Sequence, residues 1–167
     1  KFKSFVYGEA RFVDNEAETH IEIGIASRAN SKAICSGCNR TGSIYDTAAE
    51  PRLFEFIALW GFKVFFVYFM RRVNCRRCGV TVEAVPWGSG KHQLTTTYMH
   101  FLATWARRMS WTETASVFRT TWDKVHDSIL YIVTWGLAHR NLDVITAIGI
   151  DEIQWHRGHK YLTLVYQ

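Results

Sequence analysis

The sequence predicts an α+β multidomain chain: a small β zinc ribbon, then an α-helical helix-turn-helix, then a β-hairpin that opens a further domain. Three observations predict this order. All four cysteines stand in two Cys-x-x-Cys pairs, the apolar period changes from two to about 3.6 beyond residue 90, and two apolar strands flank a glycine turn near the last residue. The expected domains are an N-terminal β segment, a zinc ribbon, a helix-turn-helix and the truncated start of a further domain, over residues 1–30, 31–86, 91–140 and 146–167.

The composition excludes a disordered chain and favours a polyanionic partner. Hydrophobic residues make up 48% and charged residues 21% of the 167 residues, with a net charge of +5 and a pI near 9.1. The apolar stretch from Leu53 to Met70 reaches the threshold length of a membrane-spanning helix, roughly 18 residues. It is interrupted by Glu55, Gly61 and Lys63, which favours two strands over a membrane helix. Since no signal peptide is evident, we expect a cytoplasmic chain with reduced thiols and no membrane partner.

The N-terminal segment contains the pattern of a half-buried strand. Ile21, Ile23 and Ile25 alternate with His20, Glu22 and a glycine. Because successive side chains of a strand point to opposite faces, this alternation predicts one apolar face.

The cysteine pairs Cys35–Cys38 and Cys75–Cys78 predict a structural zinc site. Two residues between cysteines let one tight turn direct both sulfurs to a common point, and four thiolates form the tetrahedral ligand set that Zn²⁺ prefers. Arg76 and Arg77 in the second turn would offset part of the thiolate charge. The segment between the pairs is longer than the usual zinc template of roughly 15–20 residues, so disulfide bonds stay open as a competing interpretation.

A hairpin is expected between the two cysteine turns. Arg52 to Leu59 and Phe62 to Val73 are strand candidates joined by a turn, and Val80 to Val85 is a third strand after the second cysteine turn. A zinc knuckle with these strands makes a zinc ribbon, in which the metal replaces the core that so small a sheet cannot build. The following segment, Pro86 to Gly90, has the composition of a linker.

The helical part follows the linker. One face of a first helix is apolar, at positions Leu94, Tyr98, Phe101, Leu102, Trp105 and Met109. Ser110 and Glu113 form a capping box that starts a short helix. Thr120 or Thr121 caps a third helix, which runs to about His139. Two helices joined by so short a break form a helix-turn-helix pattern.

A helix-turn-helix places the start of its last helix against DNA. Docked in the major groove, that helix would present Thr121, Trp122 and Lys124 to base edges and phosphates. Arg119 and Thr120 would lie on the adjoining DNA backbone. Phosphate contact also suits three further cations, Arg107, Arg108 and Lys91. The alternative is a three-helix packing unit with solvated charges, in which Trp122 is a core or interdomain residue.

Asp151 is the most distinctive carboxylate, because it lies in the middle of an apolar strand, where an unpaired charge is costly to bury. A structural interpretation places it on an exposed edge or in a salt bridge with Arg157 or Lys160. A functional interpretation makes it a ligand of Mg²⁺, which prefers hard oxygen ligands. Both stay open on spacing alone.

The order of these motifs resembles the bacterial transposases of the ISL-three insertion-sequence family. The resemblance extends from about Ala33 onward and rests on the two cysteine pairs, the stretch from Ser110 through Val125, and Ile148-Gly-Ile-Asp151-Glu followed by Gly158-His-Lys-Tyr161. It implies that the final hairpin begins a ribonuclease-H-like domain and that Asp151 is the first aspartate of a DDE triad with catalytic magnesium.

The resemblance also implies an activity and partners. The activity is Mg²⁺-dependent cleavage and transfer of DNA strands at the terminal inverted repeats of an insertion sequence. The protein would act as a homo-oligomer on DNA and be associated with the nucleoid. The chain departs from the family pattern by stopping at Gln167, before the remaining catalytic carboxylates. We therefore expect this chain alone to bind DNA without cutting it. A non-enzymatic zinc-ribbon and helix-turn-helix regulator, or a truncated transposase remnant, is the alternative.

Overall fold

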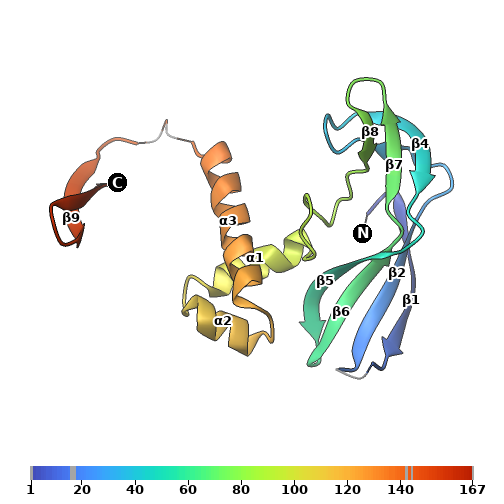
Figure 1. The fold of residues 1–167 in the computed structure, drawn as a ribbon, viewed down its shortest axis with the longest axis horizontal. Helices are drawn as coiled ribbons and strands as arrows, with labels where there is room; N and C mark the ends of the chain where they lie inside the picture. Colours follow the sequence, from blue (N-terminus) through green and yellow to red (C-terminus); the bar gives the residue numbers. More distant parts are fainter. Residues whose placement is uncertain (1, 16–17, 142, 144, 167) are drawn as a thin grey trace. The chain divides into compact units, whose positions relative to one another are not determined.

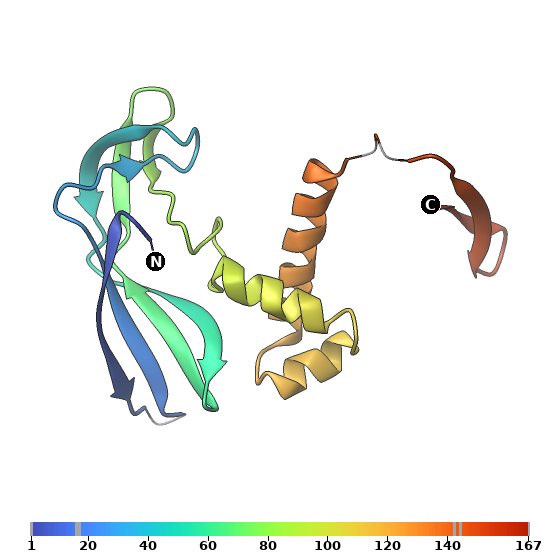
Figure 2. The ribbon, with the colours of Figure 1, turned by 180° about the vertical axis from the view of Figure 1, so that it is seen from behind.

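The computed structural model describes residues 2–15, 18–141, 143 and 145–166. The chain is α+β and divides into two compact units, Lys1–Ile132 and Val133–Gln167. The first unit holds two four-stranded sheets and the beginning of the helical part, and the second holds a β-hairpin (Figures 1 and 2).

The first sheet has the strand order β1-β2-β6-β5. Its strands are β1 (Phe5–Val13), β2 (His20–Ser27), β6 (Phe62–Tyr68) and β5 (Arg52–Leu59). Neighbours are antiparallel except β2 and β6, which run parallel. The predicted N-terminal strand is confirmed, since Ile21 and Ile25 in β2 are buried. The core of this sheet is the cluster Phe5, Ile25, Phe54, Phe66, Tyr68, Val85 and Trp87.

The burial of Trp87 differs from what the sequence predicts. The linker composition from Pro86 to Gly90 predicts an exposed connector, yet Trp87 is 1% exposed and its ring contacts those of Phe5, Phe54 and Tyr68. The apolar face of the first sheet needs a large side chain to cover it, and this indole supplies the area. Tertiary packing therefore overrides the local turn signal.

The second sheet carries the cysteines and has the order β3-β4-β7-β8. Its strands are β3 (Ala33–Ile34), β4 (Thr41–Thr47), β7 (Arg71–Cys75) and β8 (Gly79–Val82). Gly42 lets β4 approach β7 closely, because a Cβ on it would lie 2.6 Å from Val73 Cγ1. The buried cluster of this sheet is small, consisting of Ala33, Cys35, Val73 and Cys75.

The expected hairpin exists, but it pairs differently from the prediction. β5 and β6 join β2 in the first sheet, and the stretch expected as one strand, Phe62 to Val73, is divided into β6 and β7 in different sheets. Phe54 and Phe66 bury their rings against Trp87 and neighbouring aromatic residues. The small cluster around the cysteines offers no comparable apolar area, so the hairpin pairs where burial is greatest.

The helical part consists of α1 (Thr96–Trp105), α2 (Trp111–Val117) and α3 (Trp122–His139). The capping box is confirmed: Glu113 N donates to Ser110 Oγ at 3.2 Å, and Ser110 N donates to Glu113 Oε2 at 2.9 Å. Thr121 caps α3, because its Oγ1 accepts from Lys124 N at 3.3 Å. Of the predicted apolar face, Leu94, Tyr98 and Leu102 are buried in one cluster together with Met99. Trp105 is 38% exposed, and Met109 lies beyond the end of α1.

The second unit contains the antiparallel hairpin of β9 (Gly149–His156) and β10 (Lys160–Tyr166). The predicted turn between them is confirmed, with Gly158 at φ 90° and His159 at φ 57°. These left-handed conformations suit the glycine, which has no Cβ to clash. Among the described residues, no helix is long and apolar enough to cross a membrane.

Candidate metal centre and nucleic-acid interface

The four cysteine sulfurs lie together at one end of the second sheet. The Sγ atoms of Cys35, Cys38, Cys75 and Cys78 are all within 4.8 Å of one another, and those of Cys38 and Cys75 are 3.5 Å apart. A tetrahedral zinc site with Zn–S bonds of about 2.3 Å places its sulfurs roughly 3.8 Å apart. All four thiols are free, so the structure forms none of the disulfides of the competing interpretation. The donor set fits a metal such as zinc.

Backbone geometry directs both cysteine turns to the same point. In the first turn Cys35 N donates to Arg40 O at 2.8 Å and Asn39 N to Cys35 O at 2.9 Å. Ser43 of β4 is paired with Asn74 of β7, which places the two turns side by side. The prediction that two distant Cys-x-x-Cys turns converge is therefore confirmed.

The electrostatics of the cluster favour a bound cation. Hydrogen bonds from the Thr81 hydroxyl, at 3.1 Å, and from Gly37 N lower the pKa of Cys35 to about 6. A hydrogen bond to Cys38 raises the pKa of Cys78 to about 12. Four adjacent sulfurs resist ionising together because their negative charges repel one another. A divalent ion would favour the thiolate form of all four at once.

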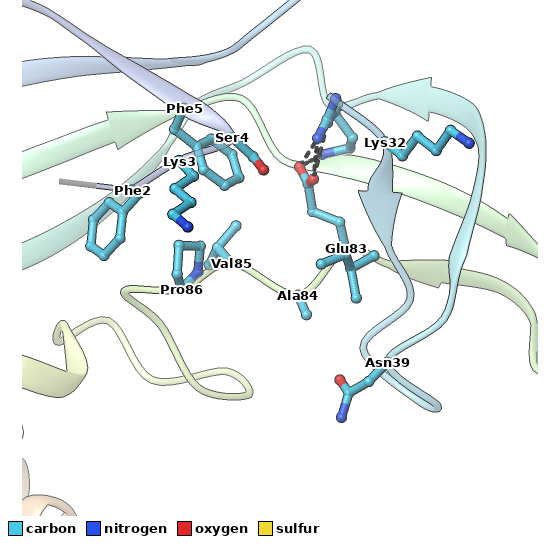
Figure 3. A pocket seen from close by; sticks show the side chains of 12 residues that line it. Phe2, Lys3, Ser4, Phe5, Lys32, Asn39, Glu83, Ala84, Val85 and Pro86 are labelled. Carbon is cyan, nitrogen blue, oxygen red and sulfur yellow. Dashed lines mark hydrogen bonds and ion pairs between the residues drawn. The ribbon is translucent and has the colours of Figure 1, made fainter. Parts of the chain in front are cut away.

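A buried ion pair attaches the cysteine sheet to the first sheet. Arg71, at the start of β7, bonds Glu83 Oε2 through Nη2 at 2.7 Å, and Tyr68 of β6 donates its hydroxyl to Glu83 Oε1 at 2.5 Å. The Arg71 and Glu83 side chains are 7% and 1% exposed. Glu83 lines a cavity of about 480 Å³ between the sheets (Figure 3). Sequence patterning missed this network, because its members lie in three different segments.

Three cations predicted to contact DNA are exposed at the two ends of α1. Arg107 and Arg108 are exposed in the corner between α1 and α2, and Lys91 is exposed before α1. Trp122 is 47% exposed at the start of α3, where its ring stacks on His126 with centroids 5.4 Å apart. These side chains can reach a ligand without rearrangement of the core.

Two other residues predicted to contact DNA are bonded to the first sheet. Lys124 Nζ lies 2.6 Å from Glu55 Oε2, and Glu55 is 3% exposed. Arg119 donates to Gly61 O at 3.1 Å and forms an ion pair with Glu18. A hydrogen bond from Lys63, with the charges of Lys63 and Arg119, holds the pKa of Glu18 below its ordinary value. The sequence signal for Glu55 was its place in an otherwise apolar strand.

The two threonines of the turn differ in their surroundings. Thr121 is exposed and caps α3 as described above, whereas Thr120 is half-buried. Thr120 Oγ1 is buried and has no hydrogen-bond partner among the described residues.

Asp151 is exposed on β9, opposite Leu164 of β10. Its Oδ1 accepts from Glu152 N at 2.8 Å. In the described part of the chain, Asp151 forms no ion pair with Arg157 or Lys160. Among the described residues, the group of metal-ligand side chains that comes together is the four cysteines, and Asp151 is not part of it.

The chain is similar to the transposase for insertion sequence element IS1557 of Mycobacterium tuberculosis, in strains CDC 1551 / Oshkosh and ATCC 25618 / H37Rv. Each is 29% identical over 168 residues, which cover 98% of this chain and 37% of the relative. The chain thus spans little more than a third of the length of these curated relatives. No protein-family model and no solved structure matches it. The similarity supports a relationship to insertion-sequence transposases.

Proposed function

We propose that this chain is the DNA-binding part of a transposase of the ISL-three type that recognises the terminal inverted repeats of an insertion sequence. The observation that carries the proposal is the similarity to the IS1557 transposase along 98% of the chain. The cysteine cluster and the three-helix segment support it, because the four converging thiols could hold a metal and three helices follow them in the chain.

The proposed roles follow from exposure. Arg107, Arg108 and Lys91 neutralise DNA phosphates, since their side chains are exposed. Trp122 at the start of α3 faces the groove, while Thr121 fixes the first turn of the helix behind it. Arg119, Thr120 and Lys124, close to Trp122 in sequence, are proposed as further DNA contacts. The zinc ligands Cys35, Cys38, Cys75 and Cys78 act at a distance from it, by holding the second sheet together.

In a protein of the relatives' length, Asp151 is proposed as a catalytic carboxylate. Magnesium would neutralise the phosphate and activate the attacking hydroxyl during strand cleavage and transfer. Asp151 suits a shared site because its carboxylate is exposed on β9, open to further carboxylates from other segments. Such a protein would act as a homo-oligomer on DNA, in the cytoplasm at the nucleoid.

Footprinting on the DNA that flanks the gene tests the proposal. We expect protection of inverted ends, and we expect this protection to be lost when a chelator removes zinc.

A salt titration tests the arginines. The double variant Arg107→Gln, Arg108→Gln should reduce the slope of log affinity against log salt by about 1.8, or about 0.9 for each lost phosphate contact. The matched control, Arg28→Gln with Arg157→Gln, removes the same charge at other exposed positions. The proposal would be contradicted if neither inverted end were protected. Cleavage of DNA by this chain alone would contradict the proposal that the chain binds DNA without cutting it.

A further inference from the structure

The two cysteine turns border a polar hollow of about 450 Å³ on the second sheet. Its lining includes three arginines from the turns themselves, Arg40, Arg76 and Arg77. Three neutral polar side chains from the adjoining strands complete this lining, Thr41, Ser43 and Asn74. All six residues are exposed. The hollow therefore combines positive charge with hydrogen-bonding groups and is open to solvent.

The convergence of the cysteines brings these arginines together. Arg40 follows the first cysteine pair by two residues, and Arg76 and Arg77 stand between the cysteines of the second pair. Because the four sulfurs meet within 4.8 Å, the two arginine-bearing turns are adjacent although they lie far apart in sequence. Thr41 and Ser43, two positions apart on β4, share one face of the strand.

Within the described part of the chain, the three guanidinium groups have no charged partner, unlike several other arginines. Arg71 and Arg72 of the same sheet are held by Glu83 and Asp46. Among the described residues, Arg40, Arg76 and Arg77 have no side-chain ion pair. Their summed charge of +3 exceeds the charge of −2 on a zinc ion with four thiolates, so offsetting the metal centre does not use all of it.

We propose that Arg40, Arg76 and Arg77 form a second DNA contact, which binds phosphates of the duplex backbone independently of the helix-turn-helix. This inference rests on the proposed DNA binding. Planar guanidinium groups match phosphate oxygens in bidentate geometry, and the neighbouring hydroxyl and amide groups add hydrogen bonds. The site is open and lacks an apolar wall for a base or a metabolite ring, which favours the sugar-phosphate backbone as its ligand.

The salt dependence of DNA affinity tests this contact. The test variant carries Arg40→Gln, Arg76→Gln and Arg77→Gln, and the probe is a 30-base-pair duplex of random sequence. We expect the slope of log affinity against log salt to fall by about 2–3, because each lost phosphate contact removes about 0.9. The control Lys3→Gln, Arg28→Gln and Arg157→Gln removes the same charge at other exposed positions, and its slope should change by less than about 0.5.

The outcomes separate this inference from the proposed function. If the unmodified protein binds neither this duplex nor the inverted ends, both are overturned. If it protects the inverted ends but does not bind the random duplex, only the second contact is overturned. If it binds and the test variant keeps its slope, or loses no more than the control, only the second contact is overturned. Tighter binding of a single-stranded RNA than of the duplex at equal salt would also overturn it. One zinc per chain and an unchanged melting temperature confirm that the test variant is folded, and the variant Arg40→Lys, Arg76→Lys and Arg77→Lys should retain most of the slope.

Discussion

Glu55 of β5 connects the first sheet to the segment that begins α1 and to the first turn of α3. Its backbone N–H donates to Gln93 O, and its carbonyl accepts from the backbone N–H of Thr95, the residue that caps α1. Its carboxylate binds Lys124 in α3. One nearly buried residue thus fixes β5, α1 and α3 together, and it does so by using a lysine that the sequence assigns to DNA.

Replacing Glu55 with Gln should therefore have two opposite effects. The free energy of unfolding should fall by about 1–2 kcal/mol, since a charged hydrogen bond is lost while Lys124, whose side chain is 34% exposed, can turn to solvent. DNA affinity should rise, with the salt slope steeper by about 0.9, because one more ammonium group becomes available to phosphate. Chemical denaturation and a salt titration of DNA binding measure the two effects.

The matched control is Glu50→Gln, which removes the same charge from an exposed carboxylate outside the helical contacts. It should alter neither stability nor slope by a comparable amount. A gain in DNA affinity that persists when Lys124→Gln is added to the Glu55→Gln variant would show that the freed lysine is not its cause.

The cysteine sheet differs from the first sheet in what stabilises it. The first sheet packs its aromatic rings around Trp87, whereas the buried cluster of the second sheet is two cysteines with Ala33 and Val73. Few apolar side chains are buried there, so we expect a bound metal to supply much of the stability of β3, β4, β7 and β8. The two sheets should then differ in how far their stability depends on the metal.

Hydrogen exchange on zinc-loaded and chelated protein measures this difference. We expect chelation to reduce the protection of β4 and β7 amides by more than about tenfold, while β5 and β6 amides keep theirs. Cys78→Ser should behave as the chelated protein does, because a ligand is lost, and Ser36→Ala in the first cysteine turn should behave as the unmodified protein. Equal loss of protection in both sheets would contradict a separate role for the metal.

At the scale of the whole molecule, patterns within a few residues predicted the structure well. The capping box at Ser110, the β2 alternation and the hairpin turn at Gly158 all form as expected, because neighbouring residues determine them. The contacts between elements were not predictable in this way. Glu18 bonds Arg119 across 101 positions and Glu55 bonds Lys124 across 69, and no periodicity relates residues so far apart.

The same reasoning explains the strand pairing that differed. The sequence shows that β5 and β6 are apolar strands but does not show which sheet offers the larger apolar face. That choice depends on Trp87, whose local context is a turn-like segment rich in glycine. For the metal centre the sequence was sufficient, since the ligand spacing itself predicts the convergence of the four sulfurs.

The link between the two sheets predicts how the first unit responds to alkali. Burial, with a hydrogen bond to Glu83, raises the pKa of Tyr68 far above its ordinary value of about 10. The folded state therefore favours the protonated phenol. This contribution to stability is complete below about pH 10 and is lost as the pH rises through the higher folded pKa.

Tyr68→Phe should lower the free energy of unfolding by about 1–2 kcal/mol at pH 7, because Glu83 loses a donor. It should also reduce the further loss of stability above pH 10. Tyr98, whose pKa burial also raises, keeps that loss from vanishing. Denaturant unfolding from pH 7 to 12 measures both effects, with the exposed Tyr45→Phe as control, and an equally steep alkaline loss in Tyr68→Phe would refute the role of this hydroxyl in joining the sheets.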